Sequence, residues 1–397
     1  MSAPGRPGAV RQRWSIVLLI ATLCASLAAP VTAPAAASVG GSTPAPMTTA
    51  PADALGAATI EDRTAVAIAF PVGLRVTGDL ALPEDTTTLS FLYQAGYDNG
   101  WNLIDIPAGD ITPTAGGTVT IDTTLDFQAL QVPLGVHLTY RWMAMTTDGQ
   151  TAVSEVKETD WYDDRQPWQE LTSDQITLHV YGMDEAFART ILDSAQGTVT
   201  ELEQRYDLAR SERLSLWIYP EAEAFRDGLP ANFRESVVGG SVVGYPLIVA
   251  VIPPGSTSEV GRIVPHEISH QVLFQATRNP FSLLPTWFDE GMATHIQIGG
   301  TGGYLGMAIA AERQGSLFDL ASLAGSFPYT PAQATLAYAA SWTAIAFILD
   351  QWGEDGITAL IRAFGEGLPE DQSIPEALGL SMTDFTAAWK AWIAAQG

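Results

Sequence analysis

Between about residue 64 and residue 161, hydrophobic and polar positions alternate along the chain in short runs that are separated by turn residues. The longest run has apolar residues at every second position: Val136, Leu138, Tyr140 and Trp142. Alternation with a period of two is typical of strands that bury one face. We therefore predict an all-β, Ig-like sandwich domain over residues 61–168. His137 and Arg141 fall on the opposite face of the longest run, where we expect solvent.

The pattern changes after Gln175, where short apolar runs alternate with a longer stretch of helical spacing. The predicted elements are strands at 176–181, 214–219 and 247–252 and a helix at 184–206. Beyond Ser256 the spacing is almost entirely helical, and Ser381 has the position of a helix cap. The last predicted helices lie at 342–352, 357–364 and 381–393. Strands followed by helices within one unit predict an α+β domain over residues 169–397.

Residues 160–165, between the two predicted domains, mix acidic and aromatic side chains. Such a mixture also occurs at cation and sugar sites. We favour an interdomain hinge that is packed by Trp161 and Trp168.

The beginning of the chain has the layout of a signal peptide, with arginines, an apolar run at 16–29 and then small residues. The run is about 14 residues long, shorter than the roughly 20 of a membrane-spanning helix. We predict a signal peptide over residues 1–37 and a secreted protein that contacts a membrane only if this segment is uncleaved. Cys24 lies in the run and is the only cysteine, so the mature chain would lack thiols and disulfides. Residues 38–60, rich in Ala, Pro and Thr, are predicted to be a flexible linker.

Acidic residues strongly outnumber basic ones: 44 Asp and Glu stand against 19 Lys and Arg, which gives a formal charge of −25. Such a surface repels nucleic acid and anionic lipid, so we predict no nucleic-acid partner. An ordinary solvated surface and one that attracts cationic substrates both fit this charge, which therefore names no substrate. The length of 397 residues and the 47% hydrophobic content suffice for two domains with separate cores.

The candidate chemistry lies in the helical region, in the sequence His-Glu-Ile-Ser-His at residues 266–270. Two histidines four positions apart on a helix project from one face, so we predict that His266 and His270 bind one Zn²⁺ ion. Glu267 lies between them and would not ligate the metal. We predict that it takes a proton from a water that the metal acidifies and delivers this proton to the leaving group.

A further carboxylate follows in the sequence Trp-Phe-Asp-Glu-Gly-Met-Ala at residues 287–293. Two histidines and one carboxylate leave the fourth zinc position open, as a hydrolase requires, so Glu290 is the predicted third ligand. Thr286 and Asp289 have the spacing of a capping box, which predicts a helix that begins there with Glu290 in its first turn. We expect Asp289 to cap this helix or to orient a histidine.

Two features near the motif leave alternatives open. Pro265 directly precedes the first histidine, and proline inside a helix removes a hydrogen bond. Either the metal-binding helix begins near Pro265, or an earlier helical turn from about residue 258 is broken there. Residues 239–244 suit an edge strand along the cleft, to which a peptide could add, and suit equally an ordinary edge strand with glycine turns.

The two motifs together resemble the gluzincin metallopeptidases, and within them the compact peptidase MA-like domains of bacterial secreted proteins. The resemblance covers roughly residues 175–392 and is specific at the motifs. It implies a zincin-like (thermolysin-type) fold and a peptide or protein substrate. It also implies one zinc ion on His266, His270 and Glu290, with Glu267 as general acid and base. The predicted sandwich is similar to an N-terminal module found with such domains.

Gluzincins usually supply a Tyr or His from a later element to donate a hydrogen bond to the oxyanion. The resemblance points to Tyr338 in this role, and an aromatic residue packed in an Ala-rich core helix is the other interpretation. His295 is a second possible donor, although five residues after Glu290 a helix directs it away from the metal.

Two other classes of function remain open at this stage. One is a weak or inactive zincin, in which the metal joins the helices and the sandwich binds a surface or partner; the presence of Glu267 argues against it. The other is an extracellular adhesion protein in which both motifs are accidental. The residues do not define a specificity pocket, so peptide bonds are the expected target through the resemblance alone.

Overall fold

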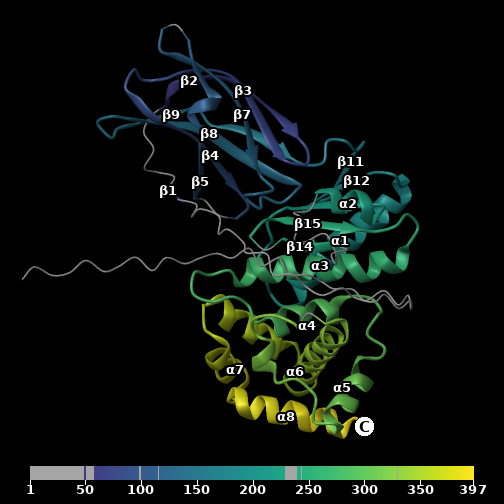
Figure 1. Ribbon diagram of the computed structural model, residues 1–397. Coiled ribbons are helices and arrows are strands. Elements are labelled where there is room, and N and C mark those ends of the chain that lie inside the picture. The colour runs from purple at the N-terminus through teal and green to yellow at the C-terminus, as the bar shows by residue number, and fades with distance from the viewer. Residues whose placement is uncertain are drawn as a thin grey trace, which may run out of the picture.

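The computed structural model describes residues 49–50, 58–97, 100–114, 116–228, 239–242, 244–328 and 330–397. The predicted signal peptide, with Cys24, lies outside the described residues. Figure 1 shows an all-β module, a further sheet and a group of helices, which follow one another in the order of the chain.

Within the described residues, the all-β module contains ten strands. They are β1 (Thr49–Ala50), β2 (Ala58–Ala69), β3 (Gly73–Ala81), β4 (Thr86–Ala95), β5 (Trp101–Asp105), β6 (Ile111–Pro113), β7 (Thr118–Asp126), β8 (Val136–Thr146), β9 (Thr151–Ser154) and β10 (Lys157–Trp161), with a 3₁₀ helix, η2, at Ala108–Asp110. The prediction of a flexible linker up to residue 60 is wrong in part, because β1 pairs with β5 and β2 already begins at Ala58. Backbone pairing needs no large apolar side chains, so composition did not indicate β1 or the first residues of β2.

Two sheets of the module face each other across one apolar core. One contains β1, β5, β4, β8 and β9, with β10 also paired to β8, and the other contains β2, β3, β7 and β6. Strand β2 joins them, since its first residues pair in parallel with β9 and the rest pairs with β3. The alternating residues of β8 point into this core, whereas His137 is exposed, as the pattern predicts. The all-β module is thus confirmed, and its Ig-like character stays a prediction.

The C-terminal domain contains its own sheet, called the second sheet below, with the order β11-β12-β13-β15-β14. Its strands are β11 (Gln169–Thr172), β12 (Ile176–Val180), β13 (Leu214–Tyr219), β14 (Gly239–Ser241) and β15 (Leu247–Val251). Strands β12, β13 and β15 pair in parallel, and the two edge strands pair antiparallel. Parallel neighbours need crossover connections. Helix α1 (Glu185–Arg205) lies between β12 and β13, and α2 (Ala222–Gly228) lies between β13 and β14.

Both faces of this sheet are covered. Ile248 and Ala250 of β15 belong to the core shared with the helices, and Val249 and Val251 belong to the core shared with the all-β module. The uninterrupted apolar sequence of β15 is explained by this burial on two sides.

The helices complete the second core. They are α3 (Thr257–Thr277), α4 (Thr286–Ile296), α5 (Tyr304–Arg313), the 3₁₀ helix η4 (Leu320–Leu323), α6 (Pro331–Gly365), α7 (Glu370–Leu378) and α8 (Met382–Ala395). Helix α6 bends at Gly353, where φ is 67°, and this bend separates the two helices predicted there. Ser381 caps α8 by accepting a hydrogen bond from the Asp384 amide, as predicted.

Among the described residues, helix α6 alone has the length and the apolar composition that would allow it to cross a membrane. However, 61% of its apolar window is buried inside the protein. It contacts α4, α5 and α7, so its apolar residues are accounted for by the core.

The connection between the module and the second sheet is tightly packed. Trp161 contacts Phe127 in the module, while the Trp168 ring lies 4.8 Å from that of Trp217 on β13. Asp163 is fully buried and pairs with Arg165 at 2.8 Å. One apolar core therefore continues from the module onto the outer face of the second sheet.

Gly291 allows α4 to cross α6 closely. A Cβ atom at this position would stand 2.7 Å from the Ser341 carbonyl oxygen and 2.8 Å from the Ile345 side chain. We predict that Gly291→Ala lowers the free energy of unfolding by roughly 1–3 kcal/mol, because the two helices must move apart. Urea denaturation measures this loss.

Gly197→Ala in α1 is the matched control, since no heavy atom of the described residues lies within 4 Å of its expected Cβ. The free energy of unfolding of this variant should rise by up to about 1 kcal/mol, because alanine has a higher helix propensity than glycine. Equal stability of the two variants would contradict the close crossing.

Candidate active site

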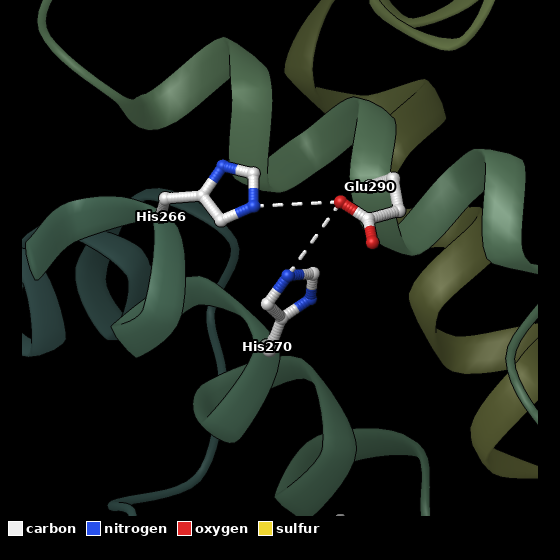
Figure 2. A group of neighbouring side chains, drawn as sticks. All are labelled: His266, His270 and Glu290. Carbon is white, nitrogen blue, oxygen red and sulfur yellow. Dashed lines mark ion pairs between the residues drawn. The ribbon is translucent and has the colours of Figure 1, made fainter. Parts of the chain in front are cut away.

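Three predicted ligands meet between α3 and α4. His266 and His270 lie one turn apart on α3, and Glu290 lies on the facing helix α4. The Nε2 atoms of the histidines stand 3.4 Å and 3.7 Å, respectively, from the same carboxylate oxygen, Oε2 of Glu290. Figure 2 shows both rings turned toward this oxygen. One ligand atom from each residue lies within 4.8 Å of the others, a spacing that suits a shared metal ion.

These three side chains are almost completely buried, with exposed fractions of 3%, 2% and 2%. Among the described residues, no hydrogen-bond partner satisfies either Nε2 atom or Oε2 of Glu290. Buried polar atoms normally have a partner, so three neighbouring ligand atoms without one are suited to share a cation. Two imidazole nitrogens and one carboxylate oxygen are a donor set that zinc prefers, so the residues fit this metal.

The other nitrogen of each histidine lies beside a second polar side chain. Oε1 of Gln297 lies 3.0 Å from His266 Nδ1, and the Gln297 amide nitrogen donates to the Gly299 carbonyl, which fixes the orientation of the amide. His266 Nδ1 must therefore donate, and its Nε2 keeps a free lone pair. Oδ1 of Asp289 lies 3.0 Å from His270 Nδ1. Such partners orient metal-binding histidines.

The capping-box prediction is wrong. Helix α4 does begin at Thr286, but Thr286 is its first helical residue, the cap position is Pro285 and no side chain caps the helix. The Asp289 carboxylate turns to His270 instead, which agrees with the expectation that it orients a histidine. Glu290 accordingly follows the first turn and does not lie within it.

Both alternatives for Pro265 are also wrong, because α3 runs from Thr257 to Thr277 with Pro265 inside it. Proline cannot donate to the carbonyl four residues earlier, which is that of Gly261. The Ile298 amide donates to this carbonyl at 2.8 Å. The Gly261 carbonyl, which Pro265 leaves without a donor in α3, thus anchors the segment after α4. This contact places Gln297 beside His266.

Glu267 is 3% exposed and accepts a hydrogen bond of 2.7 Å from the backbone N–H of Ser241, on the edge strand β14. Burial raises the pKa of its carboxyl, and the adjacent His266 and His270 act in the opposite direction. Burial by itself lowers the pKa of His270, but the neighbouring carboxylates, above all that of Asp289, outweigh it and raise that pKa to about 10. The site thus holds several acids around two imidazoles, an environment that favours a bound cation.

Tyr338, on α6, reaches the same site. Its ring lies 6.4 Å from that of His266, and the charges of Glu290 and Glu267 act on its hydroxyl. Burial, followed by the charges of Glu290 and Glu267, raises its pKa well above the ordinary value. His295 interacts instead with Arg205, whose charge adds to burial in lowering the pKa of His295.

Gln297 and Ser241 are the parts of the site that the sequence did not indicate as partners of the motif. A glutamine between a helix end and a glycine-rich loop carries no distinctive signal. The contact through Ser241 is made by backbone, which any residue type offers.

A helix pair that carries a His-Glu-x-x-His sequence and a later glutamate, beside a mixed sheet, defines a metallopeptidase-like domain. The family model of the peptidase MA superfamily matches residues 194–395, just over half of the chain. The chain therefore belongs to the peptidase MA superfamily. A search of curated proteins gives no match.

Asp289→Asn removes the charge that orients His270. We predict that this variant raises the dissociation constant for zinc by about tenfold to a hundredfold, because the ring loses its fixed direction and part of its basicity. Competition with a chromogenic chelator measures the constant. Asp193→Asn, at an exposed position of α1, makes the same change of charge and should leave the constant unaltered. Equal affinities in the two variants would contradict the role of Asp289.

Proposed function

We propose that this protein is a secreted, zinc-dependent metallopeptidase of the gluzincin type, with a zincin-like (thermolysin-type) domain. The observation that carries the proposal is the set of three unpartnered, buried ligand atoms on His266, His270 and Glu290, next to a buried Glu267. Membership of the peptidase MA superfamily supports a peptide or protein substrate. Export rests on the pattern of residues 1–37, outside the described residues.

The ligands would be His266, His270 and Glu290. When bound, a zinc ion supplies Lewis acidity, which lowers the pKa of water and polarises a carbonyl group. Asp289 and Gln297 keep the two imidazoles directed at the ion.

Glu267 is the proposed general base and acid. Its carboxylate takes a proton from the attacking water and passes it to the departing amine. Burial raises the pKa of this carboxyl, which brings it closer to the pH at which such a group exchanges protons most effectively. The Ser241 N–H holds one carboxylate oxygen and leaves the other for the proton.

Tyr338 is the proposed donor to the oxyanion. Its raised pKa keeps the hydroxyl protonated, and the ring, packed on Phe327, lies beside His266 of the ligand set. The edge strand β14, next to α3, is suited to align an extended peptide by backbone hydrogen bonds.

Glu267→Gln tests the proposed reaction. The variant should retain zinc, because Glu267 is not a ligand, and should lose at least about a hundredfold of the rate on a mixed peptide library. Glu376→Gln, at an exposed position of α7, is the control and should cleave like the wild type. Undiminished cleavage by Glu267→Gln would refute the mechanism. A zinc-loaded wild type that cuts no peptide would favour a non-catalytic zincin.

Tyr338→Phe tests the oxyanion donor. The ring and its contact with Phe327 are kept, so the melting temperature should hardly change. The value of kcat should fall about 10²-fold to 10³-fold, with KM little changed, because the lost hydrogen bond forms mainly in the transition state. Steady-state kinetics with one peptide measures both constants. An unchanged kcat would leave Tyr338 as a packed core residue.

A further inference from the structure

Tyr97 belongs to the all-β module but lies against the domain that carries the ligands. It follows β4, and its backbone N–H donates to the Gly244 carbonyl at 2.9 Å. The preceding Gly96 has φ +74°, and a Cβ there would stand 2.2 Å from the same carbonyl oxygen. The loop after β4 is therefore pressed against the turn between β14 and β15.

The Tyr97 side chain is held by one face of α3. Its ring centroid lies 5.5 Å from that of Phe274, and the Arg278 guanidinium lies 4.8 Å from it. Its hydroxyl donates to Oε1 of Gln271 at 3.0 Å and accepts from Nε2 of Gln275 at 2.7 Å. These four residues recur at the spacing of a single helical face. Burial raises the pKa of the Tyr97 phenol, so the hydroxyl remains a donor.

Gln271 connects this contact to the candidate active site. It directly follows His270, is 1% exposed, and its Nε2 donates to Oγ of Ser241 at 2.7 Å and to the Leu247 carbonyl at 3.0 Å. The carbonyl acceptors require the NH₂ group at this end, so the amide oxygen must face Tyr97. The Ser241 backbone N–H in turn donates to Glu267.

A chain of contacts thus runs from the Tyr97 hydroxyl through the Gln271 amide to the Ser241 hydroxyl and, through the Ser241 backbone, to Glu267. Hydrogen bonds in such a network support one another. If the Tyr97 hydroxyl is removed, the Gln271 oxygen loses its donor in a buried place, and only the contacts of Nε2 then hold the amide beside Ser241.

We propose that Tyr97 is a positioning residue of the peptidase site, which acts through Gln271 and Ser241 to hold Glu267 in its working orientation. The all-β module is then a part of the catalytic unit, and this role rests on the proposed function. A role confined to docking the two domains is the competing explanation.

Tyr97→Phe in the full chain is the test, because it removes the hydroxyl and keeps the ring against Phe274. We expect kcat to fall about threefold to tenfold, the effect of one buried hydrogen bond. KM and zinc content should stay at wild-type values, and the melting temperature should fall by only a few degrees, because one buried hydrogen bond is lost. Tyr162→Phe is the control, since Tyr162 stacks on Trp217 at the same domain interface through its ring and should not change kcat.

A double-mutant cycle with Ser241→Ala tests the route. Ser241→Ala cuts the link from Gln271 but keeps the backbone N–H that reaches Glu267. If Tyr97 acts through this link, the double variant should have the same kcat as the less active of the two single variants. Losses that multiply, an unchanged kcat in Tyr97→Phe, or a larger fall in melting temperature with a rise in KM would overturn the proposal in favour of docking alone.

Amide hydrogen exchange separates this inference from the proposed function. The fragment that contains Ser241 should exchange faster in Tyr97→Phe than in Tyr162→Phe. If the wild type cleaves no peptide, the proposed function fails, and the exchange result still decides whether Tyr97 orders Ser241. Equal exchange in the two variants would overturn that ordering.

Discussion

Two imidazole lone pairs and one carboxylate oxygen face one another in a buried space between α3 and α4. Acceptors at 3.4 Å and 3.7 Å repel each other unless a metal ion or a proton lies among them, and the carboxylates around His270 raise its pKa accordingly. Burial strengthens this repulsion, because the low dielectric of the interior screens charges poorly. The fold nevertheless holds His266, His270 and Glu290 in this arrangement, so packing elsewhere must supply the free energy that keeps the ligands together until a metal binds.

That packing comes from both sides of the metal-binding helix. On one side, Gly291 lets α4 approach α6, and the carbonyl that Pro265 leaves free anchors the segment with Gln297. On the other side, the second sheet is packed between the helices and the all-β module. Tyr97 of the module contacts α3 directly after the His-Glu-x-x-His sequence, through Gln271. The interrupted hydrogen-bond pattern at Pro265 and Tyr97 of the all-β module therefore both help to fix the site.

The sequence was most informative where a short local pattern decides the structure. The spacing from His266 to His270 places both rings on one helical face, and the apolar run of β15 needs burial on two sides. It failed where a distant partner decides. The spacing of Thr286 and Asp289 fits a capping box equally well, but His270 competes for the carboxylate. Tyr97 and Gln271 are 174 positions apart, so no local pattern links them.

The most direct test is the zinc content of the purified protein, determined by elemental analysis on the wild type and on Glu290→Ala. We predict one zinc ion per wild-type chain, and loss of most of it in Glu290→Ala, because two imidazoles alone bind the ion far more weakly. A wild type without zinc, or a Glu290→Ala variant that retains it fully, would contradict a metal centre built on these three residues.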